Sequence, residues 1–429
     1  MSRVIVVGGG WAGCAAALTA RRAGAEVVLL ERTDMLLGTG LVGGIMRNNG
    51  RFTAAEEMIA LGGGELFRLC DSVSRHRNLD FAGHRHAWLY DVSRIEPLVR
   101  HTLQAAGVKV ETNSRVVAVE TSKDSIHTVR TGDGRAYQGD AFVDATGTAG
   151  PQGNCRRYGN GCVMCIYRCP AFGGRLGLAA LAGAKEYAAL RRGGGRGALS
   201  GSCKLQKGSL APELVQELEA SGKLVLPVPP ALHDRGIKLK QKACQQYALP
   251  EFADNIILLD TGPAKLMTPF FALEDLRCFE GLERARFEDP YAGGLGNSVR
   301  FLAMLPRDNS LRVQGLDNVF CAGEKAGPLV GHTEAIVTGT LAGYNAARIL
   351  AGLEAFILPA KLAVGDIIAY TRDQVEKGDG LYQRYTFSGA EYFARMQQRG
   401  LYTTCREAIK NRVADLAGLF SLPVHSRKN

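Results

Sequence analysis

Four cysteines lie within fifteen residues of one another in this 429-residue chain. They are Cys155, Cys162, Cys165 and Cys169, and the last of them is followed by Pro170. The spacing Cys-x2-Cys-x3-Cys-Pro at the end of this run is the ligand spacing of bacterial 4Fe-4S sites. The four thiolates therefore predict one 4Fe-4S cluster, a group that transfers single electrons.

Two other uses of these thiols stay open. Soft thiolates bind zinc as well as iron–sulfur clusters, although structural zinc usually takes two separated ligand pairs. Cys162 and Cys165 could instead act as a redox dithiol. The fourth cluster ligand is the least defined, because Cys203 or Cys244 could replace Cys155.

A glycine turn near the N-terminus predicts a nucleotide site. The motif Gly8-x-Gly10-x-x-Gly13 lies between an apolar strand at 4–7 and a helix of small residues. Glycines at these positions permit a tight turn, close approach of a pyrophosphate, and packing of the helix on the strand. Glu31 ends the next strand and can accept hydrogen bonds from ribose hydroxyls. The expected contacts are Gly8, Gly10, Trp11, Ala12, Gly13, Glu31 and Arg32.

Two later segments indicate which nucleotide is bound. Asp144–Gly147 and Gly315–Glu324, together with the glycine turn, resemble the glutathione-reductase-type FAD proteins. This resemblance implies that the first segment passes near the pyrophosphate and that Glu324 binds the ribityl chain. It also implies a helix that directs its N-terminus at the flavin pyrimidine. The further cofactor contacts expected are Val117, Ala145, Thr146, Gly147, Gly323, Glu324, His332, Thr333 and Glu334.

A longer string narrows the resemblance. Residues 321–347 are similar to the flavin segment of the glucose-inhibited-division-A type, a group that includes the folate- and FAD-dependent tRNA uridine methyltransferases. This similarity implies FAD, NAD(P)H as a reductant, and RNA substrates. Two features depart from the methyltransferases: residues 38–50 lack the cysteine that they place near the flavin, and the cysteine-rich insertion is extra. The string at 158–172 resembles uncharacterised iron–sulfur flavoproteins.

Three side chains are candidates for chemistry beside the flavin. His332 and Glu334 fall at the start of the expected flavin-facing helix, where either could exchange protons. A helix cap or a hydrogen-bond partner is the alternative for both residues. Arg47 follows a glycine-rich stretch that should pass the isoalloxazine, and it could bind the N5/O4 edge or hold a substrate. A plain turn is the alternative for Arg47.

The order of elements predicts an α/β fold with a split Rossmann-like FAD-binding domain of glutathione-reductase type. Residues 1–150 form its first part and 311–354 its second, with a cysteine-rich substrate domain inserted at 151–310. Residues 355–429 form a helical C-terminal region. Helices are expected over 91–106 and from about 333 to 350. The Asp133-Gly134 pair predicts a hairpin, because glycine accepts the positive φ that the turn requires.

The net charge of the chain and the distribution of its basic residues are compatible with a polyanionic binding partner. The chain carries a net charge of +10, and basic residues gather in 151–210 and near the C-terminus. No apolar run approaches the ~18–20 residues that cross a membrane. The N-terminus enters a strand directly, without a signal-peptide pattern. We therefore expect a cytoplasmic protein without a membrane span, whose oligomeric state the sequence leaves undefined.

Together these features predict an FAD-dependent iron–sulfur oxidoreductase. One 4Fe-4S cluster would pass electrons to or from the flavin, with a small molecule or a protein as electron donor. The alternative function is an RNA-modifying flavoenzyme similar to the tRNA methyltransferases. A third hypothesis is a flavin and metal protein without catalysis, which senses redox state or scaffolds RNA.

Overall fold

The computed structural model describes residues 2–147, 169–190, 198–199, 203–233, 249, 251–267, 272–288, 299–300 and 302–424. Its centre is a five-stranded sheet with the order β19-β10-β1-β2-β6. All four strand pairs in it are parallel. The strands are β1 (Arg3–Val7), β2 (Glu26–Leu30), β6 (Lys109–Glu111), β10 (Ala141–Asp144) and β19 (Val319–Cys321). The expected α/β class with a parallel sheet is confirmed.

The topology of this sheet locates a crevice. The chain runs from β1 to β2 and β6 on one side of the sheet, and the later strands β10 and β19 are added on the other side of β1, so the strand order reverses beside β1. In open α/β sheets, ligands bind outside the carboxyl ends of the strands at such a switch point. Residues 8–13, 145–147 and 322–334 follow the carboxyl ends of β1, β10 and β19, so this crevice is where they meet.

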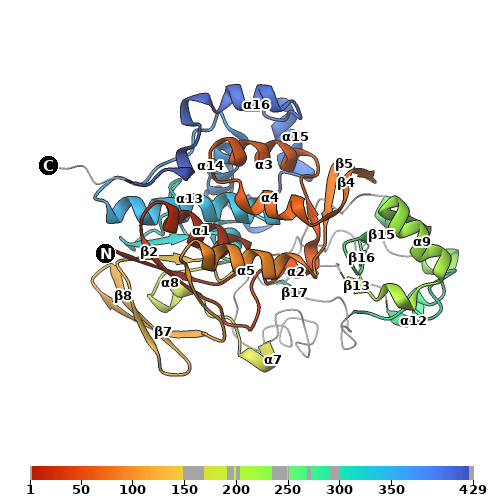
Figure 1. Ribbon diagram of the computed structural model, residues 1–429, viewed down its shortest axis with the longest axis horizontal. Helices are drawn as coiled ribbons and strands as arrows, with labels where there is room; N and C mark the ends of the chain where they lie inside the picture. Colours follow the sequence, from red (N-terminus) through yellow and green to blue (C-terminus); the bar gives the residue numbers. More distant parts are fainter. Residues whose placement is uncertain are drawn as a thin grey trace.

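Two long helices, α1 (Trp11–Arg22) and α13 (His332–Leu350), pack against each other and the sheet (Figure 1). Their close approach depends on two glycines of α13. A Cβ on Gly339 would lie 2.1 Å from the Ala12 carbonyl oxygen, and one on Gly343 would lie 2.1 Å from the Ala16 carbonyl oxygen. Backbone contact of this kind fixes the start of α13 relative to the start of α1.

Two small antiparallel sheets flank the central one. The first has the order β3-β5-β4, and the second has the order β7-β8-β9. Gly134, in the predicted hairpin turn, has a φ of +88° and lies between two paired strands, which confirms that hairpin. The strands are β3 (Ile45–Met46), β4 (Ser74–Phe81), β5 (His84–Tyr90), β7 (Val116–Ser122), β8 (Ser125–Thr131) and β9 (Ala136–Gln138).

A further body with its own apolar core lies between 203 and 288. Its four-stranded antiparallel sheet has the order β13-β16-β15-β14, and α9 and α12 pack on it (Figure 1). Apolar side chains of 252–267 also pack on β3 and β5, which joins this body to the cofactor-side segment. Its elements are β13 (Cys203–Leu205), α9 (Pro212–Ser221), β14 (Lys223–Pro227), α11 (Glu251–Asp254), β15 (Asn255–Asp260), β16 (Ala264–Leu266) and α12 (Leu273–Leu276).

Short elements connect this body to the central sheet. They include α7 (Cys169–Phe172), α8 (Leu178–Leu181) and two strand pairs, β11 with β18 and β12 with β17. Those strands are β11 (Tyr187–Ala188), β12 (Ala198–Leu199), β17 (Val299–Arg300) and β18 (Ala303–Met304). The boundaries of the inserted domain stay a prediction.

The C-terminal helices and α3 lie on the side of α13 away from the central sheet, whereas α5 packs beside β6 (Figure 1). The C-terminal ones are α14 (Ala363–Glu376), α15 (Ala390–Gln398) and α16 (Arg406–Arg412). The others are α2 (Gly40–Gly43), α3 (Gly50–Ala60), α4 (Glu65–Ser72) and α5 (Ile95–Ala105). The helix expected over 91–106 is therefore confirmed, with a later start. Among the described residues, no helix is long and apolar enough to cross a membrane.

Candidate functional site

The turn after β1 admits only glycine at two positions. Gly8 has a φ of +103°, and a Cβ there would lie 2.4 Å from the Ala145 carbonyl oxygen. A Cβ on Gly13 would lie 1.7 Å from the Gly8 carbonyl oxygen. Gly10 is different, because no heavy atom of the described residues lies within 4 Å of where its Cβ would be. The space beside Gly10 is therefore open to a bound group.

The first turn of α1 faces this open space with its N–H groups. The first hydrogen bond of the helix runs from the Cys14 N–H to the Gly10 carbonyl, at 2.9 Å. The N–H groups of Trp11, Ala12 and Gly13 precede that bond, and no side chain of the described residues caps the helix. Uncapped N–H groups and a helix dipole together suit a phosphate.

Glu31 lies on the other side of the turn. Its carboxylate accepts hydrogen bonds from the N–H groups of Gly9 and Thr33, both at 2.7 Å. These bonds hold the carboxylate at the end of β2, where it remains 9% exposed. Val117 lies on β7 and is partly buried. The Ser114 N–H, three residues earlier, donates to the Glu31 carbonyl at 2.8 Å, so this strand begins next to Glu31.

Three arginines surround the same end of the turn: Arg32 and Arg115 bind the segment after α7, and Arg175 belongs to that segment. Arg32 donates to the Gly173 carbonyl at 2.5 Å, and Arg115 donates to the Gly174 carbonyl at 2.7 Å. Arg175 lies next to Gly147, where a Cβ would be 3.2 Å from its Nη1. Burial lowers the pKa of Arg32, and the charge of Arg175 lowers it further. This end of the site is strongly cationic.

The segment after β10 is held against the turn by Asp144. The buried Asp144 carboxylate accepts the Thr146 hydroxyl at 2.7 Å and the Ala179 N–H at 2.9 Å. Gly147 has a φ of +68°, which favours glycine. Ala145 and Thr146 therefore lie beside Gly8, and Gly147 follows them.

The segment after β19 approaches from the third side. Gly323 has a φ of +64°, its N–H donates to Thr338 Oγ1 at 2.9 Å, and its Cβ position is 3.1 Å from Ala12. Glu324 is half-buried near Arg384. Burial lowers the pKa of Arg384 to about 10, and the charge of Glu324 opposes that shift. The next residue, Lys325, is fully buried in an ion pair with Glu186.

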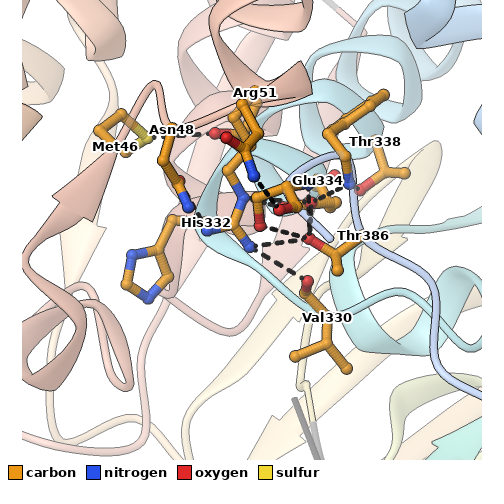
Figure 2. A network of polar contacts seen from close by, with 12 residues as sticks. Met46, Asn48, Arg51, Val330, His332, Glu334, Thr338 and Thr386 are labelled. Atoms are coloured by element: carbon orange, nitrogen blue, oxygen red, sulfur yellow. Dashed lines mark hydrogen bonds and ion pairs between the residues drawn. The ribbon is translucent and has the colours of Figure 1, made fainter. Parts of the chain in front are cut away.

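Glu334 forms a buried ion pair rather than facing an open space (Figure 2). Its side chain is 1% exposed, and its carboxylate oxygens lie 3.2 Å from Arg51 Nε. Oε1 also accepts the Thr386 hydroxyl at 2.6 Å and the Phe387 N–H at 2.8 Å. The carboxylate connects α13 to α3 and to the C-terminal segment. These bonds match the hydrogen-bond alternative rather than proton exchange.

His332 and Thr333 begin α13 in different environments. The His332 ring turns away from the Arg51–Glu334 pair (Figure 2) and is partly exposed. Its Nδ1 lies 3.3 Å from the Tyr90 hydroxyl. Thr333 is buried and donates its hydroxyl to the sulfur of Met46 at 3.2 Å.

Arg47 occupies an internal ion-pair network. Its guanidinium donates to both oxygens of Asp71, at 2.8 and 2.5 Å, and to Glu56 at 2.6 Å. The same group stacks over the Trp88 ring, with 4.9 Å between Cζ and the ring centre. The side chain is about 1% exposed. Arg47 therefore secures the segment between β3 and α3, with its guanidinium bound to Asp71 and Glu56 instead of facing a cofactor or substrate.

Sequence reasoning missed four residues that shape the site. Arg51 and Tyr90 bind the first turn of α13 through Glu334 and His332. Lys204 and Lys265 are directly opposite each other on β13 and β16, and their Nζ atoms donate to the Leu41 and Val42 carbonyls of α2. None of the four belongs to a local motif. Among these four residues, only Arg51 could have been suspected from its place in the sequence, because it directly follows the glycine-rich segment at 38–50.

Most of the predicted metal ligands lie outside the described residues. Cys155, Cys162 and Cys165, and the alternative ligand Cys244, all do so. Cys169 begins α7 and is partly buried, and its charge raises the pKa of Arg32. Within the described ranges, no three His, Cys, Asp or Glu side chains gather as a metal site.

Comparisons with known proteins identify a family and solved structures that are similar to this chain. A family model described as glucose inhibited division protein A matches residues 3–210 and 227–354. The GidA structure from Aquifex aeolicus in its form II crystal has a TM-score of 0.71 and 18% identity, covering 98% of this chain and 73% of that one. The form I crystal of the same protein gives a TM-score of 0.66 and 17% identity, covering 98% and 76%. The two likenesses show a shared fold.

Proposed function

This chain belongs to the glucose inhibited division protein A family, and from that membership we propose that it is an FAD-dependent enzyme that modifies RNA. The cofactor is inferred from the geometry of the site. The substrate class is inferred from the family resemblance and from the net charge of +10. The observation that carries the proposal is the uncapped first turn of α1, which faces the open space beside Gly10.

The residues present fit FAD. Three N–H groups precede the first hydrogen bond of α1 and suit the pyrophosphate. Glu31 presents a fixed carboxylate for ribose hydroxyls at the end of β2. Glu324 follows β19 on the opposite side of the turn, where a ribityl chain would pass. His332 and the N-terminus of α13 lie beyond it, at the place where an isoalloxazine would end.

FAD supplies hydride and single-electron transfer when it is bound. The chain binds and orients it, and one of its own residues moves a proton. His332 is the candidate residue for this proton transfer, because its imidazole ring is partly exposed. Glu334 is a positioning residue, since Arg51 and Thr386 already occupy its carboxylate.

The cysteines near the site limit the kinds of reaction by which the protein could modify an RNA base. Residues 38–50 contain no cysteine, so the thiol that the methyltransferases place there is absent. Cys14 and Cys321 are fully buried, and burial raises the pKa of Cys321 to about 12. Neither is suited to attack a pyrimidine as a thiolate. We therefore propose a modification of RNA that does not pass through a cysteine adduct at these positions.

RNA binding is tested by retention of unmodified tRNA over a series of salt concentrations. The purified flavoprotein should retain tRNA at low salt, and the logarithm of the binding constant should fall linearly with the logarithm of salt concentration. A DNA duplex of equal length is the matched control, because it lacks the 2′-hydroxyls and the folded shape. Equal retention of both nucleic acids, or of neither, would contradict an RNA substrate.

Electron transfer through a 4Fe-4S cluster is a second candidate function. The cysteine spacing favours it, and Cys169 connects the cysteine run to the arginines beside Glu31. The two hydrogen bonds from Arg32 and Arg115 secure Gly173 and Gly174 at that place. Cys169, the last of the four cysteines, would hold the cluster from the start of α7, close to Arg32.

Anaerobic purification with iron, sulfide, zinc and flavin measured per chain tests this second candidate. Four iron and four sulfide per chain would support one cluster. Cys165→Ser should then lose most of the iron while the flavin remains, because the glycine turn is a separate element. Cys278→Ser is the control, since Cys278 is exposed on the neighbouring body. Zinc without sulfide would exclude electron transfer through these thiols.

A further inference from the structure

Residues 173–177, termed the strap, form neither a helix nor a strand and connect α7 to α8. Two side chains from outside the segment bind its first two residues. Arg32, which follows β2, donates to the Gly173 carbonyl at 2.5 Å. Arg115, which precedes β7, donates from Nε to the Gly174 carbonyl at 2.7 Å. The start of the strap is therefore bound beside the carboxyl end of β2.

The rest of the strap continues past other carboxyl ends of the central sheet. Arg175 Nη1 lies 3.5 Å from the Thr146 carbonyl oxygen, just after β10. At Gly177, a Cβ would lie 2.9 Å from Nζ of Lys325, in the segment after β19. The sheet order β19-β10-β1-β2-β6 puts β1 between these places and the start of the strap. The strap therefore crosses the edge of the sheet at which the glycine turn follows β1.

The strap is held less firmly than the helix that follows it. Leu178 and Ala179, at the start of α8, are fully buried in the main apolar core. The Asp144 carboxylate also accepts the Ala179 N–H at 2.9 Å. The strap itself is bound at two of its carbonyls by arginine side chains, which are long and partly exposed. A segment bound in this way can open locally while the sheet and α8 stay folded.

The arginines that hold the strap also lie next to the carboxylate that suits the ribose hydroxyls of FAD. Arg32 directly follows Glu31 in the sequence. The Ser114 N–H, one residue before Arg115, donates to the Glu31 carbonyl at 2.8 Å. The strap is therefore fastened next to Glu31, at the end of the site that suits the adenosine of FAD.

We propose that the strap closes over the adenosine half of bound FAD and that Arg115 is a positioning residue that keeps it closed. Dissociation of FAD then requires the strap to open first, so the strap determines how long the cofactor stays bound. This role of the strap rests on FAD binding in the proposed function and is independent of the substrate.

The rate constants of FAD binding to FAD-free protein, followed by flavin fluorescence, test this role. Arg115→Met should raise the dissociation rate constant roughly tenfold without lowering the association rate constant, because a latch acts after the cofactor has entered. A lost attraction for the phosphates would instead lower the association rate constant. Arg130→Met is the matched control, because Arg130 is half exposed on the neighbouring strand β8 and binds Glu120. It removes the same charge and should leave both rate constants unchanged.

Hydrogen exchange in the wild-type strap is a second measurement, and it remains decisive if Arg115→Met does not fold. Exchange at the backbone amides of residues 173–177 should be roughly tenfold slower with FAD than without it. Equal exchange in the two states overturns the role of the strap.

Failure of the proposed function gives a different result. A wild-type protein that takes up no FAD contradicts the proposed function, and the strap then has no cofactor to cover. FAD uptake with an unchanged dissociation rate constant in folded Arg115→Met overturns the role of the strap alone.

Discussion

Glu334 and Arg51 form an ion pair that is almost completely removed from water. Their side chains are 1% and 3% exposed, and Thr386 and Val330 provide further hydrogen bonds to the pair. Two buried charges are tolerated in a protein when each is neutralised and hydrogen-bonded by the other. The pair secures the first turn of α13 to α3, and through this contact it sets where His332 lies.

Removing one partner of this pair should be costly. Glu334→Ala leaves the Arg51 guanidinium buried without its carboxylate, which should lower the free energy of unfolding by about 3–5 kcal/mol. Denaturation in urea measures the change. The double variant Arg51→Met/Glu334→Leu is the control, because it removes both charges together and should recover most of the loss. A single variant as stable as the wild type would contradict the assigned role.

The sequence located the residues of this first turn but not their partners. Position at a helix start after a glycine-rich loop was enough to select His332 and Glu334. Arg51 is 283 residues from Glu334, and Tyr90 is 242 residues from His332. No local pattern predicts contacts over such separations. The same reason explains why the expected flavin contact of Arg47 was not found. Its neighbours in the sequence suggested that contact, but in the fold its guanidinium binds Asp71 and Glu56.

At the scale of elements, Glu57 joins three helices. It lies on α3 and is fully buried. Its carboxylate accepts the N–H groups of Ala363 and Val364, at 3.1 and 3.0 Å, in the first turn of α14. It also binds Arg412, the last residue of α16, at 3.2 Å. Glu57 therefore acts as the N-cap of a helix that is 306 residues away, where Leu362 offers no side-chain cap.

This contact predicts a pH dependence of stability. Burial raises the pKa of Glu57 from its usual value to about 7, against the opposing effects of the two N–H donors and Arg412. Between pH ~4.5 and 7 the folded protein retains a proton that the unfolded chain has released. Stability should therefore fall as the pH rises through this window, by up to about 1.4 kcal/mol per pH unit.

Urea denaturation of the wild type and Glu57→Gln across that pH range checks this expectation. The glutamine cannot titrate, so its stability should be flatter with pH. Glu407→Gln alters an exposed carboxylate of α16 and should keep the wild-type slope. A wild-type stability that rises steadily over the same range would show that Glu57 titrates well below this window.

Elements with strong local signals were predictable. The glycine turn, the hairpin at Gly134 and the helix at 332–350 each depend on periodicity or on a φ that only glycine accepts readily. The later start of α5 shows the limit of periodicity, because Asp91 lies buried before the helix and accepts the Ser93 N–H at 2.9 Å. The antiparallel body at 203–288 had no clear local signal, since its strands are short and pair across long connections.

At the scale of the whole molecule, two bodies meet beside the crevice. Lys204 and Lys265 of the antiparallel body donate to carbonyls of α2, the short helix that encloses Trp11 and His332. The segment after α7 approaches from the other side and is bound by Arg32 and Arg115. The parallel sheet therefore provides the nucleotide turn, and later segments of the chain complete the walls around it.

The central claim is that the space beside Gly10 holds the phosphates of FAD, and a titration of FAD-free protein with FAD tests it most directly. Gly10 has a φ of −67° and an open Cβ position, so Gly10→Ala should fold like the wild type. Gly208→Ala is the control, because its Cβ position is equally open but distant from the turn. Flavin fluorescence should show at least a tenfold weaker affinity for Gly10→Ala, about 1.4 kcal/mol, and wild-type affinity for Gly208→Ala. Equal FAD affinity in all three proteins would contradict the account.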